Sequence, residues 1–219
     1  YARVEFTPTV LHDVSHADTG REILGRRASL PFAFAPTGFT RMMNHQGEPA
    51  VARAAARAGV PYALSTMGTT SPERLAAEAP DGRRWFQLYL WRDRAASTEI
   101  VRRAAENGYE ALVLTVDTPV GGLRLRDVRN GMTIPPALTA RTILDGARHP
   151  SWWVDLLTTE PLEFASLTSF AGTVSDLASQ VFDPSATLAD VRRQGFVVTP
   201  GHVHPDAAGV AVPVRNGLQ

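Results

Sequence analysis

Four short apolar runs, separated by longer polar segments, constrain the fold of this chain more than any other feature of its sequence. The runs lie at residues 30–36, 60–66, 84–90 and 109–117. Their length and their content of aromatic and β-branched residues are typical of strands buried on both faces. We therefore predict four buried strands.

Three segments connect these runs, and each has the composition of a helix. They are residues 47–59, 71–80 and 93–108. Glycines at the ends of the first and third segments are helix stop signals, and a Ser-Pro pair opens the second. The sequence thus predicts the order β-α-β-α-β-α-β.

Strands that alternate with helices at this spacing pair in parallel through right-handed crossovers. Two architectures meet this condition, an open doubly wound sheet and a (β/α)8 barrel. A dinucleotide-binding sheet normally carries a Gly-x-Gly-x-x-Gly turn after its first strand, and segment 35–48 has none. The sequence therefore favours the barrel.

Composition narrows the classes of function. Basic and acidic residues balance at 22 each, so no electrostatic argument favours a nucleic acid as partner. The chain has neither Lys nor Cys, which excludes a Schiff-base lysine, a thiol nucleophile and a disulfide framework. No apolar run reaches the ~20 residues that span a bilayer. We expect a cytoplasmic location, with peripheral membrane association as the alternative.

The carboxyl ends of the four predicted strands all carry hydrogen-bonding groups. In a parallel barrel these ends form the active-site face. A single polar residue there can simply cap a loop, but four strand ends in register are harder to attribute to capping. The residues concerned are Pro36, Thr37, Gly38, Ser65, Thr66, Gln87, Tyr89, Thr115 and Asp117.

The chemistry of these groups indicates a pocket for a small cofactor and an acid. Backbone amides, hydroxyls and an amide side chain can hydrogen-bond a flat heterocycle that carries imide groups. Arg124 offers a planar guanidinium fork and Tyr89 a phenol, which together suit a small carboxylate. The residues alone therefore predict a cofactor pocket beside an acid-binding arginine.

Five separated motifs resemble the FMN-dependent 2-hydroxy-acid dehydrogenase and oxidase family, which includes glycolate oxidase, mandelate dehydrogenase and L-lactate dehydrogenase. The motifs are "FAPTGF", "ALSTMGT", "WFQLYLWRDR", "LTVDTPVGGLRLRDVRNGM" and "WWVDLLTTEPLEFASL". The resemblance is strongest to the L-lactate dehydrogenase branch and runs from about residue 3 to residue 191 in one order. Agreement of five motifs is specific, whereas any one of them would be weak.

The resemblance implies a (β/α)8 TIM barrel, of which this chain holds roughly the first half, with FMN across the barrel mouth. It implies that one group of residues lines the flavin ring and that another hydrogen-bonds its pyrimidine portion. The first group is Pro36, Thr37 and Gly38, and the second is Ser65, Gln87 and Thr115.

The resemblance also implies a reaction, the oxidation of a lactate-like L-2-hydroxy acid to a 2-oxo acid. The flavin accepts the hydride, and a histidine takes the hydroxyl proton. Tyr89 and Arg124 would bind the substrate. Asp117 would orient the histidine, as an acid behind an imidazole does in a catalytic triad. The electron acceptor is left open, and a homo-oligomer is an allowed assembly.

Several parts that the resemblance implies for the second half of the family do not occur in this sequence. They are a lysine near the flavin, a Ser-Asn-His-Gly-Gly segment with the catalytic base, and a phosphate site. We therefore predict a partial dehydrogenase domain at residues 1–191, a non-matching tail at 192–219, and a chain that is inactive by itself. The lack of an initiator Met and of a signal peptide leads us to expect that the chain begins partway through a domain.

An alternative is a non-catalytic half-barrel that acts as a binding or assembly protein. Four strands of an eight-stranded barrel would leave the outer strands unpaired, which favours pairing with another chain. A different barrel enzyme, such as a phosphate-binding isomerase, is disfavoured by the five motifs.

We predict no metal site at the histidines outside the motifs. His12 and His16 are spaced i,i+4, while His202 and His204 alternate, with Asp206 nearby. Either pair would need regular structure to aim both rings at one ion. We expect a strand-and-turn entry to the barrel in the first region and a poorly ordered tail in the second.

Overall fold

The computed structural model describes residues 5, 7, 10–13, 15–118, 125–129, 140–147, 149–160, 182–187, 189, 198–204 and 207–213, some of them, including the last two ranges, by backbone alone. The strands in this part of the chain are β1 (Arg21–Ile23), β2 (Arg26–Ala28), β3 (Tyr62–Ser65), β4 (Arg84–Tyr89), β5 (Ala111–Thr115), β6 (Val198–His204) and β7 (Ala207–Pro213). The helices are α1 (Thr40–Met43), α2 (Gly47–Ala58), α3 (Pro72–Glu78), α4 (Arg94–Glu106), α5 (Leu125–Arg129), α6 (Ala140–Gly146) and α7 (Pro150–Thr158).

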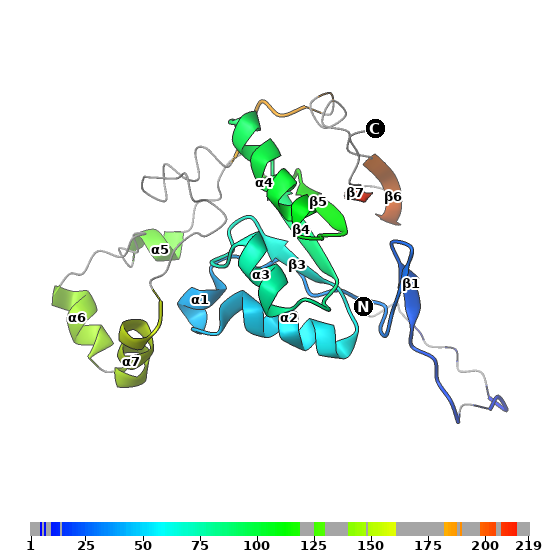
Figure 1. The fold of residues 1–219 in the computed structure, drawn as a ribbon, viewed down its shortest axis with the longest axis horizontal. Helices are drawn as coiled ribbons and strands as arrows, with labels where there is room; N and C mark the ends of the chain where they lie inside the picture. The colour runs from blue at the N-terminus through cyan, green and yellow to red at the C-terminus, as the bar shows by residue number, and fades with distance from the viewer. Residues whose placement is uncertain are drawn as a thin grey trace.

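The central sheet has five strands in the order β3-β4-β5-β7-β6. Its first three strands are parallel, and their register sets Ser65 opposite Gln87, and Tyr89 opposite Thr115. Helices α3 and α4 form the crossovers between these strands, and with α2 they lie against the sheet (Figure 1). The predicted second, third and fourth strands and the three predicted helices are confirmed.

Local sequence explains where these helices begin and end. α2 ends at Gly59, whose φ of 65° lies in the left-handed region that glycine adopts most easily. At the start of α3, Ser71 Oγ accepts a 3.2 Å hydrogen bond from the Arg74 N–H. At the start of α4, the Asp93 carboxylate accepts hydrogen bonds from two backbone N–H groups at 2.9 and 3.1 Å. Each cap satisfies backbone groups that the helix itself leaves unpaired.

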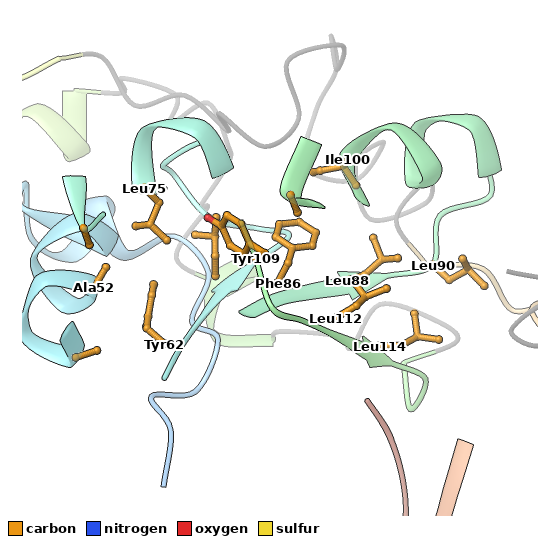
Figure 2. Packing of buried hydrophobic residues seen from close by; sticks show 14 of the residues in the cluster. Ala52, Tyr62, Leu75, Phe86, Leu88, Leu90, Ile100, Tyr109, Leu112 and Leu114 are labelled. Carbon is orange, nitrogen blue, oxygen red and sulfur yellow. The ribbon is translucent and has the colours of Figure 1, made fainter. Parts of the chain in front are cut away.

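The hydrophobic core lies between these helices and the parallel strands (Figure 2). Leu64, Leu75 and Phe86 are completely buried in it. The rings of Phe86 and Tyr109 meet edge to face with their centroids 6.1 Å apart, and the Tyr109 hydroxyl donates a 3.2 Å hydrogen bond to the Pro72 carbonyl. This packing fixes α3, β4 and the residues that lead into β5 relative to one another.

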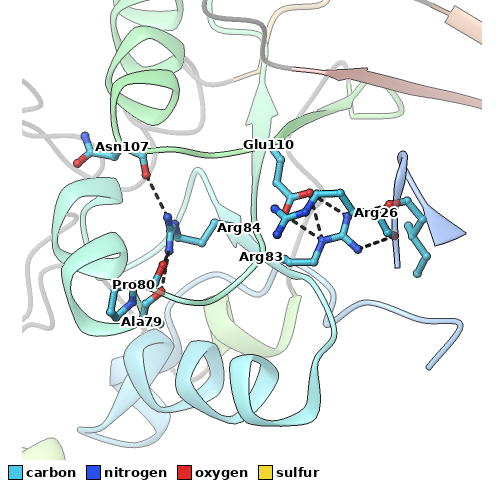
Figure 3. A network of polar contacts seen from close by, with 8 residues as sticks. Arg26, Ala79, Pro80, Arg83, Arg84, Asn107 and Glu110 are labelled. Atoms are coloured by element: carbon cyan, nitrogen blue, oxygen red, sulfur yellow. Dashed lines mark hydrogen bonds and ion pairs between the residues drawn. The ribbon is translucent and has the colours of Figure 1, made fainter. Parts of the chain in front are cut away.

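An ion pair holds the amino-terminal end of the sheet. The Arg83 guanidinium donates to both carboxylate oxygens of Glu110, with distances of 2.8 to 3.1 Å, and its side chain is buried. It also donates to the carbonyls of Ile23 at 2.7 Å and Arg26 at 3.1 Å (Figure 3). Arg83 therefore joins the β1–β2 hairpin to the sheet at the end opposite to the polar strand ends.

The first predicted strand is wrong in extent. Residues 30–36 form a single parallel bridge between Phe34 and Tyr62. Phe34 N–H donates to the Pro61 carbonyl at 2.9 Å, and Ala63 N–H donates to the Phe34 carbonyl at 3.0 Å. Prolines at positions 31 and 36 have no N–H to donate, which limits a longer ladder. The segment nevertheless lies beside β3, where a first barrel strand is expected.

The prediction that the edge beside β5 is unpaired is also wrong, and the described part of the tail forms two strands where none is predicted. β7 pairs antiparallel with residues 111–113 of β5, and β6 pairs antiparallel with β7. The expectation of a non-regular backbone around His202 and His204 is wrong as well, because these residues lie in strand β6. Pairing with β7 stabilises this strand although the local Pro and Gly residues disfavour one. An antiparallel neighbour does not extend a parallel barrel, and the described residues form no closed barrel.

The segment beyond β5 contains three short helices among the described residues. The helix predicted around residues 152–157 is confirmed as α7, whereas α5 and α6 are not predicted. The two helical pieces predicted within 173–195 fall almost entirely outside the described residues. None of the described helices combines the length and the apolar character needed to cross a bilayer.

Candidate functional site

Three of the predicted site residues form one hydrogen-bonded row at the carboxyl ends of the parallel strands. Ser65 Oγ donates to Gln87 Oε1 at 3.2 Å, and Gln87 Nε2 donates to Thr115 Oγ1 at 2.7 Å. Ser65 ends β3, Gln87 lies in β4 and Thr115 ends β5, so the row crosses three strands. We call Ser65, Gln87 and Thr115 the strand-end row.

Thr66 strengthens this row through the backbone. Its N–H donates to Gln87 Oε1 at 3.2 Å, and its hydroxyl donates to the Gln87 carbonyl at 2.5 Å. The same hydroxyl accepts a 3.2 Å hydrogen bond from the Tyr89 N–H. Because Gln87 Oε1 is already occupied by two donors, the orientation of the amide is fixed and its NH₂ group points along the row. The sequence places Thr66 at a strand end but does not reveal this bracing role.

The end of the first predicted strand lies against the turn that follows β3. The Phe39 N–H donates to the Met67 carbonyl at 3.0 Å. A Cβ atom on Gly38 would lie 2.9 Å from the Cβ of Met67, a distance that real side chains avoid, so only glycine fits without a shift. Pro36 and Thr37 are exposed beside this contact.

The remaining predicted residues are not joined to the strand-end row by side-chain hydrogen bonds in the part of the chain that the structure describes. Tyr89 is half-buried, and its ring meets Phe182 edge to face with centroids 5.4 Å apart. Asp117 is exposed, two residues beyond Thr115. Arg124 lies outside the described residues. Phe182, which sequence reasoning did not identify, brings a segment distant in sequence next to Tyr89.

The chemistry of the strand-end row suits an uncharged heterocycle. The Gln87 amide has two N–H bonds and uses one on Thr115, while the Thr115 hydroxyl accepts that bond and keeps its own hydrogen to donate. Neutral donors in a row match carbonyl and imide groups better than they match a phosphate or a metal ion. Among the described residues, no group of three or more His, Cys, Asp or Glu side chains could hold a metal.

Comparison with known proteins leads to the same kind of ligand as the chemistry of the strand-end row. Residues 1–195 match the family model described as FMN-dependent dehydrogenase. The chain belongs to the FMN-dependent dehydrogenase family. Members of this family use FMN and are (β/α)8 TIM barrels, of which this chain covers only a part. The predicted family and cofactor are confirmed.

Two curated relatives illustrate the similarity. The chain is 57% identical over 188 residues to the Mycobacterium tuberculosis protein named "Putative L-lactate dehydrogenase", covering 86% of this chain and 45% of that protein. It is 49% identical over 138 residues to the 4-hydroxymandelate oxidase of Amycolatopsis orientalis, covering 63% of this chain and 38% of that enzyme. The chain therefore spans less than half the length of these two relatives.

A solved structure shares the fold of most of this dehydrogenase-family chain. It is the monotopic membrane protein (S)-mandelate dehydrogenase, which matches with a TM-score of 0.78 and 35% sequence identity. The match covers 87% of this chain and 52% of that one. The assignment of this chain to part of a barrel of this family is thus supported by structure as well as by sequence.

Proposed function

We propose that this chain carries the first half of a site for the FMN-dependent oxidation of an L-2-hydroxy acid, with a lactate-like acid as substrate. The observation that carries the proposal is the strand-end row, in which three adjacent strand ends offer neutral donors and acceptors side by side. The names of the relatives, which refer to lactate and mandelate, support a small 2-hydroxy carboxylate.

Under this proposal two groups of residues hold the cofactor. Pro36, Thr37 and Gly38 line the flavin ring, and the strand-end row hydrogen-bonds its pyrimidine portion. The close contact between Gly38 and Met67 supports the first assignment, since it leaves backbone rather than side chain at this edge of the site. When bound, FMN supplies the hydride acceptor.

Three further residues are proposed to act on the substrate. Arg124 binds its carboxylate through two parallel N–H donors, and Tyr89 contacts its reacting hydroxyl. Asp117 orients a histidine base and stabilises its protonated form. The exposed position of Asp117, close to the end of β5, is compatible with a partner supplied from outside residues 1–191.

We propose residues 1–191 as the partial dehydrogenase domain and residues 192–219 as a tail whose sequence does not match the family, although its strand β7 pairs with β5. The Ser-Asn-His-Gly-Gly segment that would carry the histidine base does not occur in this sequence, and the chain covers less than half of the two relatives described above. We therefore expect the isolated chain to bind FMN without turning over substrate. The electron acceptor is not assigned.

Titration of FMN with the purified chain, followed by quenching of flavin fluorescence, tests the binding half of this proposal. Thr115→Val removes the hydroxyl of the strand-end row, and we expect it to weaken FMN binding by about tenfold. Thr98→Val is the matched control, because Thr98 is exposed on α4, not at a strand end, and its hydroxyl donates to the Arg94 carbonyl of the same helix. Equal affinities in the two variants, or no binding by the unaltered chain, would remove the FMN assignment.

A non-catalytic half-barrel is the second candidate. The absence of a closed barrel in the described residues favours it. Size-exclusion chromatography with light scattering separates the two candidates when it is combined with the titration. A defined assembly whose formation is unaffected by Thr115→Val, together with no FMN binding, would support the half-barrel function.

We also propose peripheral association with membranes, because the mandelate dehydrogenase neighbour is named a monotopic membrane protein. α6 and α7 expose large apolar side chains, among them Leu144 at 70% and Leu157 at 78% of their surface. The chain should therefore co-sediment with lipid vesicles, and the double variant Leu144→Ser, Leu157→Ser should stay in the supernatant. Equal retention of both forms would contradict this assignment.

A further inference from the structure

One buried acid lies behind the candidate site and has no part in the chemistry proposed above. Glu48 is in the first turn of α2, and its surface is completely buried. Its carboxylate accepts hydrogen bonds from the Thr69 N–H at 2.7 Å, from Thr69 Oγ1 at 2.7 and 2.9 Å, and from Thr70 Oγ1 at 2.9 Å. A fully buried carboxylate is costly unless such donors surround it.

All these donors belong to the turn between β3 and α3, which also contains site residues. The turn begins directly after Ser65, whose Oγ accepts a 3.1 Å hydrogen bond from the Met67 N–H. The Glu48 carboxylate therefore fixes Thr69 and Thr70 at the end of this turn. The turn starts directly after Ser65, the first member of the strand-end row.

The same turn supports the segment that follows the first predicted strand. The Met67 carbonyl accepts from the Phe39 N–H at 3.0 Å, and Thr69 Oγ1 lies 3.3 Å from the Arg41 backbone N, which donates to it. The segment 36–41 is thus attached to the turn 66–70 at two points. Both points lie within three residues of the groups held by Glu48.

From this chain of contacts we infer that Glu48 is a positioning residue, whose carboxylate sets the separation between segment 36–41 and turn 66–70 on which FMN binding depends. The inference rests on the proposed function for the identity of the cofactor. The geometric part of it, the coupling of two segments through one carboxylate, does not depend on any ligand.

Glu48→Gln tests the inference, because it keeps the size of the side chain and replaces one acceptor oxygen by an NH₂ group that faces hydroxyl donors. We expect hydrogen exchange of the Phe39 and Thr69 amides to accelerate by about tenfold, while the Phe86 amide in β4 is unchanged. We expect FMN to bind about tenfold more weakly to the folded variant. Glu78→Gln is the matched control, since Glu78 pairs with Arg53 on the surface.

A milder variant keeps the test valid if Glu48→Gln does not fold. Thr70→Val removes one donor to the carboxylate and should loosen the same two amides by a smaller factor, with FMN affinity falling in parallel. Uniform acceleration of all amides, or unchanged FMN affinity with loosened segments, would overturn the inference. If the unaltered chain binds no FMN, the proposed function fails, while the exchange pattern still decides whether Glu48 couples the two segments.

Discussion

The Nε2 atom of Gln87 donates a 2.7 Å hydrogen bond to the Oγ1 atom of Thr115, and this contact joins the polar ends of two parallel strands. Gln87 is almost completely buried, so its amide must find partners inside the protein. Thr115 provides one of them, and Ser65 and Thr66 provide the others. The residues that complete the sheet are therefore the same ones that we propose to hold the cofactor.

Replacing Gln87 by Met should destabilise the protein and weaken FMN binding together. The thioether has a similar shape but removes the amide that bonds the Ser65 and Thr115 hydroxyls, a loss worth about 1–3 kcal/mol. The Thr66 N–H keeps the Gln87 backbone carbonyl, which it bonds at 3.0 Å. Urea unfolding measures the change in free energy of unfolding, and fluorescence quenching measures the affinity. A stability loss with unchanged FMN affinity would separate the strand-end row from cofactor binding.

Replacing Arg83 by Met should be among the most destabilising single changes. It leaves the largely buried Glu110 carboxylate with the exposed Arg26 as its remaining partner and removes two bonds to the β1–β2 hairpin, at a cost of about 3 kcal/mol. The midpoint of urea unfolding reports this loss. Arg102→Met is the control, because Arg102 pairs with glutamates on the exposed face of α4 and should change stability little. Comparable effects of the two changes would contradict the role assigned to Arg83.

Replacing Tyr109 by Phe should remove one buried hydrogen bond and leave the core packing intact. The lost partner is the Pro72 carbonyl at the start of α3, and the expected cost is about 1 kcal/mol. The edge-to-face contact with Phe86 is retained, so Tyr109→Leu should cost more. Chemical unfolding of the two variants gives the order, and equal costs or the reverse order would contradict the contribution assigned to the ring contact.

The contribution of Glu48 to stability should disappear in acid. Burial raises the pKa of this carboxyl, but hydrogen bonds that include those from Thr69 outweigh burial and hold the pKa below its ordinary value of 4.5. A lowered pKa adds stability above pH 4.5, and that stability is lost as the pH falls through the pKa of the folded state. Tyr62 is a titratable neighbour on β3, and its pKa is raised by burial and by Glu48, so it stays neutral across this range.

Urea unfolding from pH 7 to pH 3 should therefore show a stability difference between the unaltered chain and Glu48→Gln that narrows below pH 4.5. A difference that widens in acid would mean that the carboxyl is protonated in the folded protein.

Sequence reasoning identifies the repeating part of the fold because that part depends on local signals. Apolar runs mark β3, β4 and β5, and caps such as Ser71 and Gly59 mark helix ends, so the elements are visible one at a time. Pro31 and Pro36 shorten the first strand to one bridge. This outcome depends on which N–H groups of residues 30–36 would face acceptors on β3, and the local sequence does not specify that register. The antiparallel pairing of β7 with β5 joins residues about 100 positions apart and has no local signal.

The sequence by itself determined the family, the cofactor, and the alternation of α2, β3, α3, β4, α4 and β5, since motifs and periodicity are carried by neighbouring residues. Only the tertiary structure decided that Ser65, Gln87 and Thr115 share one hydrogen-bonded row, because parallel register brings together residues more than 20 positions apart. It also decided that Glu48 is buried behind the site. An acid in a first helical turn usually faces solvent, and only the packing of α2 against the turn after β3 supplies the donors that keep this one inside.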